Sequence, residues 1–442
     1  MRITLLDELD LAHWVTVNAK REGVKDVAVD ISKSREVSVS FRDGKMDELK
    51  ESTRKSMTLG IYVDNKYSSH TTNDMRRDSV IEFIKKAVAM TKYLGEDKYR
   101  QLPDPKYFQD MEYQDLQIRD VSYETIQSNQ RVELARTLEE GGRQRSDKVI
   151  SCTGEYGDNF TESLKVTTNG FVGEKISTSF YAYCDASIKD DQGNIVEGSD
   201  NTNMRHFEDL DNSGKISHTA VDRALRKIGQ KKIASGVYDM IVINRRASRI
   251  LGTVLRSLSG RSLQQKNSFL IDMLDNKIAS DILTIVDDPF IPRGIGSRLY
   301  DREGMAAHKR SIIENGVLKS YLIDSYYGRK LGMEPTGGGT SNLILNYGEK
   351  SLDEMVAEMK RGILVTGFLG GSSNETTGDF SYGVNGFLIE DGKAIQPINE
   401  MNISGNFKDL LNRLTEIGND PHLISSQRFA SLKFEDVQFS GL

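Results

Sequence analysis

The residue types that usually carry chemistry are few and scattered in this chain of 442 residues. No Cys-x-x-Cys pair, Gly-x-Ser-x-Gly elbow or Gly-x-x-x-x-Gly-Lys phosphate loop is present. The histidines never stand three to five positions apart, so no single helix can present two of them to one metal ion. The six histidines are His13, His70, His206, His218, His308 and His422.

The glycine-rich run GFLGGSSNETTGDFSYGVNG, residues 367–386, is the most unusual segment. Its six glycines permit positive φ angles and close backbone approach, which would let a peptide add as a strand at a sheet edge. A mobile surface loop between strands is the alternative interpretation, and it applies equally to the TGGG cluster of residues 336–339. The candidate substrate-binding residues of the run are Gly370, Gly371, Ser372, Thr377 and Asp379.

A second hypothesis makes the chain a hydrolase by itself, with ligands brought together in space. Glu375 and Asp379 are a possible carboxylate pair for general acid and base work, and His308 is a possible third member. The favoured interpretation of His308, however, is an ordinary strand histidine in the segment MAAHKR.

Composition and charge restrict the class of protein. The chain is 37% hydrophobic and 28% charged, with a net charge of −6, and these values are typical of a globular protein and disfavour direct nucleic-acid binding. Acidic residues interrupt the N-terminal segment, so we expect neither a signal peptide nor a membrane anchor. Cys152 and Cys184 are expected to be small buried residues rather than a disulfide, and a cytoplasmic location follows as the expectation.

Hydrophobic alternation predicts an N-terminal α+β domain over residues 1–234. It contains two strand-and-helix modules, 1–94 and 121–234, joined by a connector at 95–120. Alternating runs at 27–31, 37–41 and 59–63 precede a helix that a Ser79-x-x-Glu82 capping box would open. Strands resume from about 149 to 205, and further helices are expected near 8–22, 121–142 and 217–230.

Residues 235–442 are predicted to form a mostly-β C-terminal domain, so the fold class is α+β. Its first strand, Val237–Ile243, leads into a helix over 245–260 with Asn244 as the N-cap and Gly260 at its end. Short helices are expected near 324–331, 351–361 and 405–416. The remaining strands are expected at about 278–286, 305–314, 317–323, 343–348, 363–369, 383–390 and 393–404.

Several segments together resemble the TldD/PmbA family, also known as modulators of DNA gyrase. In the N-terminal half the resemblance lies in REVSVSFRDGKMDELKESTRKSMTLGIYV. In the C-terminal half it lies in KNSFLIDMLDNKIASDILTIVDDP, YLIDSYYGRKLGMEPTGGG, TGDFSYGVNGFLIEDGK and SGNFKDLLNRLTEIGND. The resemblance covers nearly the whole chain, and two of these segments look more like the PmbA branch, also called TldE.

The resemblance implies where a metal site would lie. The TldD branch carries a His-Glu-x-x-x-His helix and a C-terminal cysteine for zinc-dependent peptide hydrolysis. Placed on that pattern, the first His corresponds to Leu251, the Glu to Gly252 and the second His to Arg256. Leucine cannot ligate, glycine cannot act as a base, and arginine repels a divalent cation. No cysteine follows Cys184, so this chain resembles the branch without metal ligands.

The leading hypothesis is a non-catalytic subunit of a TldD-type zinc peptidase that helps enclose a channel for unfolded or small peptides. No catalytic residue, metal or cofactor is expected in this chain, and zinc is expected in a TldD-type catalytic partner. A homodimer is expected when that partner is absent. Besides the self-contained hydrolase, a regulatory binding protein acting on DNA gyrase is the remaining alternative, since the family bears that name.

Overall fold

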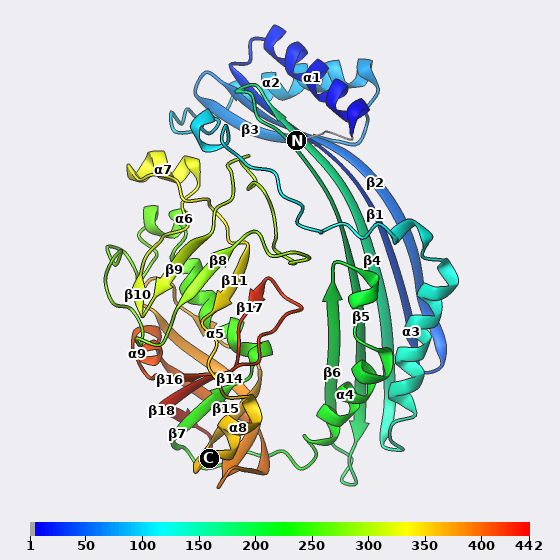
Figure 1. The fold of residues 1–442 in the computed structure, drawn as a ribbon, viewed down its shortest axis with the longest axis vertical. Helices are drawn as coiled ribbons and strands as arrows, with labels where there is room; N and C mark the ends of the chain where they lie inside the picture. The colour runs from blue at the N-terminus through cyan, green and yellow to red at the C-terminus, as the bar shows by residue number, and fades with distance from the viewer. Residues whose placement is uncertain (1–4) are drawn as a thin grey trace.

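A long, curved antiparallel sheet dominates the N-terminal half of the computed structural model, which describes residues 5–442 (Figure 1). Its strand order is β3-β2-β1-β4-β5-β6, so the two expected strand-and-helix modules contribute to one continuous sheet. The strands are β1 (Asp26–Arg42), β2 (Lys45–Val63), β3 (Lys66–Thr72), β4 (Val149–Thr167), β5 (Val172–Lys189) and β6 (Ile195–Met204).

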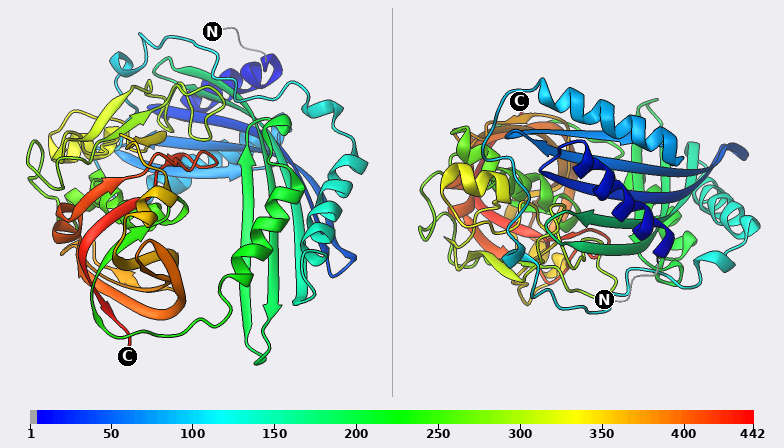
Figure 2. Two further views of the ribbon diagram at one scale, coloured as in Figure 1. Left: turned by 60° about the horizontal axis from the view of Figure 1, so that its bottom comes forward. Right: turned by 90° about the horizontal axis from the view of Figure 1, so that it is seen from above.

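The alternating runs at 27–31 and 37–41 lie in the single strand β1 and point to the same face of the sheet. Residues 27–31 pack in a cluster with α1 and α2, whereas residues 37–41 pack in a separate cluster with Tyr123 and α3 (Figures 1 and 2). One strand therefore serves two cores. The helices of this half are α1 (Leu6–Arg21), α2 (Arg77–Lys92), α3 (Ser128–Arg143) and α4 (Ser213–Leu225), with 3-10 turns η1 (Pro105–Tyr107), η2 (Tyr123–Thr125) and η3 (Phe207–Asp209).

The predicted capping box at Ser79 is wrong. Helix α2 already begins at Arg77, and its N-cap Arg76 makes no side-chain cap. Asp74 instead accepts the backbone N–H of Arg76, so a turn before the helix fixes its start.

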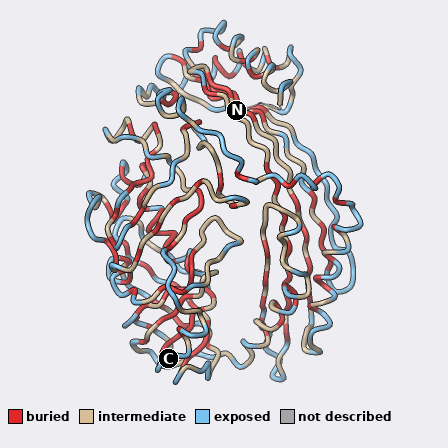
Figure 3. The backbone as a smooth tube through the Cα atoms, in the orientation of Figure 1, coloured by how far each residue is buried: buried red, intermediate tan, exposed pale blue. Residues whose placement is uncertain are grey.

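The C-terminal half contains a closed ring of strands. Strand β7 pairs with β12 and β18, β15 joins β18 to β14, and β14 pairs with β12. The largest apolar cluster of the described residues lines this ring and the helix α5 (Asn244–Ser257) beside it. Figure 3 shows the buried residues of this half in red. The strands of this sheet are β7 (Gly236–Val242), β12 (Arg361–Phe368), β13 (Ser372–Ser373), β14 (Asp379–Glu390), β15 (Lys393–Asn406), β16 (Leu414–Ile417) and β18 (Leu432–Ser440).

A second, smaller sheet lies beside the ring in the order β10-β9-β8-β11-β17. The strands expected at 278–286, 305–314 and 317–323 are much shorter here, because most of those residues form loops joined by isolated bridges. These strands are β8 (Ile285–Asp288), β9 (Arg310–Glu314), β10 (Val317–Leu318), β11 (Asn342–Leu345) and β17 (Gln427–Arg428). The helices of this half are α5 (Asn244–Ser257), α6 (Gly260–Gln264), α7 (Ser325–Leu331), α8 (Leu352–Ala357) and α9 (Phe407–Asn412).

The predicted α+β class is confirmed, with antiparallel strands in the first half and a strand-rich second half. Cys152 and Cys184 are buried thiols as predicted, and their Sγ atoms lie 3.7 Å apart. Over residues 5–442, no helix combines the length and the apolar character needed to cross a bilayer.

Candidate functional site

Helix α5 forms because six apolar residues recur at helical spacing and bury one face. Its predicted ends are wrong. Asn244 is the first helical residue rather than the cap, and its amide donates to the carbonyl of Asp420. Gly260 begins the next helix, α6, after a Ser259 N-cap. The buried face comprises Ala247, Ile250, Leu251, Val254, Leu255 and Leu258.

The three positions that the family pattern assigns to metal chemistry lie on different sides of α5. Leu251 is fully buried in the apolar core. Arg256 is exposed, and its Nε lies 2.8 Å from an oxygen of Glu375. Gly252 lies between them, where an added Cβ would meet only Arg256 Nη1 at 3.7 Å. An i to i+5 spacing separates side chains by roughly 140° around a regular helix, which agrees with this divergence.

These residues do not fit a zinc ion. A buried leucine offers no ligand, and Arg256 holds a fixed positive charge that is already paired with Glu375. Among residues 5–442, no group of three or more His, Cys, Asp or Glu side chains is placed to hold a metal ion. At these positions helix α5 therefore offers zinc neither a ligand nor a base.

The glycine-rich segment folds against the exposed side of α5. Gly370 and Gly371 have φ angles of +78° and +94°, which glycine adopts at no steric cost. Their carbonyl oxygens accept hydrogen bonds from Arg249 at 3.4 and 3.2 Å. Ser372 starts the short strand β13, paired with β14.

Thr377 and Asp379 lie at the other end of this segment. The Thr377 hydroxyl donates to Asp379 at 2.6 Å, and Asn406 donates to the same carboxylate at 2.9 Å. These two hydrogen bonds, Thr377 first, lower the pKa of Asp379. The contacts of Asp379 thus stabilise the turn in which it lies. That Gly370, Gly371, Ser372, Thr377 and Asp379 contact substrate stays a prediction.

The members of the self-contained hydrolase hypothesis have separate local roles. Glu375 is paired with Arg256, and Asp379 accepts from Thr377 and Asn406. His308 is exposed and lies in the loop before β9, not on a strand as predicted.

A cavity of about 400 Å³ lies on the exposed face of α5. Four arginines line it, together with Phe368 and Gly370 from the glycine-rich side. Sequence reasoning missed this cluster, although the segment RRASR places arginines at i, i+1 and i+4 on one side of the helix. The four arginines are Arg245, Arg246, Arg249 and Arg256.

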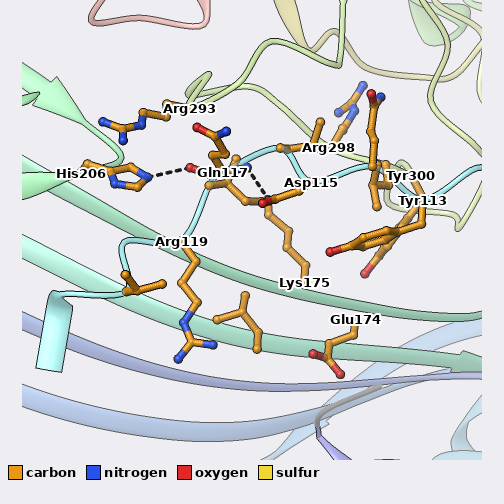
Figure 4. Close-up of a pocket in the computed structure, with 16 residues that line it drawn as sticks. Tyr113, Asp115, Gln117, Arg119, Glu174, Lys175, His206, Arg293, Arg298 and Tyr300 are labelled. Carbon is orange, nitrogen blue, oxygen red and sulfur yellow. Dashed lines mark hydrogen bonds between the residues drawn. The ribbon is translucent and has the colours of Figure 1, made fainter. Parts of the chain in front are cut away.

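A second cavity, of about 540 Å³, lies where the connector passes between the two halves (Figure 4). Lys175 of β5 points into it beside Tyr113 and Tyr300. Burial, and then Arg205 and Arg298, lower the pKa of Lys175 to about 8.

Sequence models of three PmbA/TldA metallopeptidase domains match this chain. Domain 1 covers residues 27–91, the central domain covers 122–228, and the C-terminal domain covers 235–441.

Relatives match over almost the full length. A crystal structure from Bacteroides thetaiotaomicron, named as a candidate modulator of DNA gyrase, is 39% identical, covers 99% of both chains and superposes with a TM-score of 0.96. The metalloprotease PmbA of Escherichia coli O157:H7 is 26% identical over 99% of this chain and 96% of its own length. TldE from Thermococcus kodakarensis shares the fold, with a TM-score of 0.86 at 22% identity over 98% of this chain and all of its own.

The fold and the three consecutive domains are those of a PmbA/TldA metallopeptidase, and this chain belongs to that family. The predicted family is confirmed.

Proposed function

We propose that this chain is the non-catalytic subunit of a TldD-type zinc peptidase. The partner subunit would supply the metal, its ligands and the general base. This chain would complete the enclosure around small or unfolded peptides.

The observation that supports this proposal is helix α5. The family fold is retained over the whole chain, yet Leu251 is buried in the core and Arg256 is held by Glu375. To restore the two metal ligands, the side chain at position 251 would have to point away from the core, and the ion pair of Arg256 with Glu375 would be lost. A scaffold kept without its chemistry is well suited to a binding or enclosing role.

The glycine-rich segment is our candidate for part of the enclosing wall. Gly370 lines the α5 cavity, and the carbonyls of Gly370 and Gly371 face Arg249. Glycines leave main-chain groups accessible, so they suit contacts with peptide backbones of varied sequence.

Co-expression with a TldD-type subunit from the same genome tests the proposal. We expect the two chains to co-purify, zinc to be present at one equivalent per pair, and unfolded peptides to be cleaved only by the pair. This chain alone is expected to self-associate and to contain no zinc, as measured by size-exclusion chromatography and elemental analysis. Stoichiometric zinc with peptide cleavage by the isolated chain would contradict the proposal and support the self-contained hydrolase.

A variant of this chain tests the reason for the missing site. In Leu251→His/Gly252→Glu/Arg256→His, we expect no tight zinc binding, because position 251 faces the apolar core and no C-terminal cysteine is present. Tight stoichiometric zinc in that variant would show that the site needs only these three residues.

A further inference from the structure

The arginines of the α5 cavity differ in how their charges are compensated. Arg245 forms an ion pair with Asp200 of β6 at 2.5 Å, and Arg256 forms one with Glu375 at 2.8 Å. Arg246 and Arg249 have no carboxylate within salt-bridge distance in the described part of the chain. Two of the four guanidinium groups are therefore uncompensated.

Neutral groups hold these two arginines in place. Arg246 Nε donates to the carbonyl of Thr366 at 3.3 Å. Arg249 donates to the carbonyls of Gly370 and Gly371, and its guanidinium lies 4.5 Å from the centre of the Tyr382 ring. Each side chain is oriented but keeps further N–H donors.

The surroundings add positive charge to the cavity. Arg223 lies 2.8 Å from Asp200, so this carboxylate is shared between Arg223 and Arg245. Burial, and then Arg223, lower the pKa of Arg246. Five arginines thus face two carboxylates, and an anion entering the cavity would relieve the repulsion among them.

We propose that the α5 cavity binds a carboxylate group of a peptide, with Arg246 and Arg249 as its principal donors. This inference rests on the proposed function, since it assigns to the enclosing subunit a preference among peptides. Planar guanidinium groups bind carboxylates through paired N–H donors, and the hydroxyl of the exposed Ser248 on the same lining adds hydrogen-bonding capacity.

The dimensions and position of the cavity favour a peptide end or an acidic side chain. Its volume of about 400 Å³ falls in the lower range of small-ligand sites. Phe368 supplies an apolar wall for the stem of such a group. The cavity lies on the helix that would carry the metal-binding residues in the TldD branch, so a carboxylate held here would sit along the same enclosure.

Binding of defined peptides to the full-length chain tests the inference. The probes are hexa-alanine peptides with an uncharged fluorophore at the N-terminus, ending either in a free carboxylate or in an amide. A second pair ends in amide and carries Glu or Gln at the last position. We expect the acid forms to bind at least about tenfold more tightly than their neutral counterparts, as measured by fluorescence anisotropy.

The two pairs of probes distinguish the source of the carboxylate. A preference in the first pair identifies the C-terminus, and a preference in the second identifies an acidic side chain. Equal binding of acid and neutral forms in both pairs would overturn the inference, and so would displacement by inorganic phosphate at concentrations comparable with the peptide.

Variants locate the site. Arg246→Gln/Arg249→Gln is expected to abolish the preference, and Arg246→Gln alone to reduce it severalfold, because a single guanidinium then remains. Arg54→Gln, on the exposed part of β2, is the matched control and should bind as the wild type does. Retained acid preference in the double variant, with an unchanged circular-dichroism spectrum, would also overturn the inference.

The same measurements separate this inference from the proposed function. Acid-selective binding that depends on the arginines, in a chain that never associates with a TldD-type subunit, would leave the site standing and remove the enclosing role. A complex that cleaves peptides but shows no preference for the acid forms would support the enclosing role and remove the carboxylate site.

Discussion

Two arginine sites in this molecule differ in what surrounds the guanidinium. In the N-terminal half, Arg131 of α3 is 4% exposed and its Nε lies 2.5 Å from Asp158, which is fully buried. Tyr123 and Tyr156 donate to the same carboxylate at 2.7 and 2.8 Å. On α5, by contrast, Arg246 faces a cavity and is held only by a carbonyl.

The difference separates a structural charge from one available for binding. A guanidinium that is buried beside its own carboxylate gains fold-specific contacts and lies out of reach of a ligand. Burial, and then the Asp158 carboxylate, raise the pKa of Tyr123 and Tyr156, so both phenols stay protonated as donors. An arginine that is oriented only by neutral groups has no carboxylate to compensate its charge. Its positive charge and its remaining N–H donors are therefore available to an incoming anion.

The largest expected effect is the loss of the buried pair. Asp158→Ala leaves Arg131 buried and unpaired, and we expect it to lower the free energy of unfolding by about 3–5 kcal/mol. Chemical denaturation followed by circular dichroism measures this difference.

The matched control removes both charges. Arg131→Met/Asp158→Asn eliminates the isolated charge. The asparagine oxygen can accept from one tyrosine while its amide donates to the hydroxyl oxygen of the other, so this variant should recover most of the loss. If Asp158→Ala were as stable as the wild type, the ion pair between Arg131 and Asp158 would contribute no more to stability than an exposed pair does.

An intermediate effect is expected where the glycine-rich segment holds Arg249. An added Cβ at Gly371 would lie 2.2 Å from the carbonyl oxygen of Ser381, whereas one at Gly370 would meet nothing within 4 Å. Both residues have positive φ, so Gly370→Ala should cost about 1 kcal/mol from backbone strain alone, and Gly371→Ala about 1–3 kcal/mol more because β13 must move.

Peptide cleavage by the assembled complex gives this pair its functional test. We expect Gly371→Ala to reduce cleavage severalfold and Gly370→Ala to change it little. Arg249 contacts both carbonyls, but only the Cβ added at Gly371 collides with β14 and displaces the segment. Unchanged cleavage with Gly371→Ala would remove the segment from the enclosing wall.

The same contrast explains how far the sequence predicts this structure. Periodicity locates α5 and its buried face because those positions depend on local spacing and burial, and the family resemblance then identifies 251, 252 and 256 as informative. It does not reveal the arginine cavity, since Asp200 and Thr366 lie far from α5 in sequence. Nor does it find the Arg131 site, in which the carboxylate belongs to a strand 27 residues away.

Helix ends and short strands were the least predictable features for a related reason. The residue before α2 is fixed by Asp74, and α5 begins next to contacts from Asp420 and Ser431. Such tertiary contacts override the local preference of Ser79 or Asn244 for a cap.

At neutral pH, the smallest expected effect on stability comes from one titration beside the arginine cavity. Burial, and then Arg245 and Arg246, lower the pKa of His422 to about 4, with Asp200 opposing and Arg223 adding to the shift. The pKa of His422 in the folded chain lies below the ordinary 6.5, so the unfolded chain binds the proton more tightly. The free energy of unfolding therefore decreases as pH falls from 6.5 towards 4, by up to about 1.4 kcal/mol per pH unit. His422→Gln should remove this loss, which is measured as the difference between the pH–stability curves of the variant and the wild type.

Arg246→Gln should raise the His422 pKa in an NMR titration, because the variant lacks one positive charge that faces the imidazole. An unchanged pKa in that variant would mean that burial and the remaining charges set the shift without Arg246, and that the charge of Arg246 is screened although no carboxylate of the described residues pairs with it.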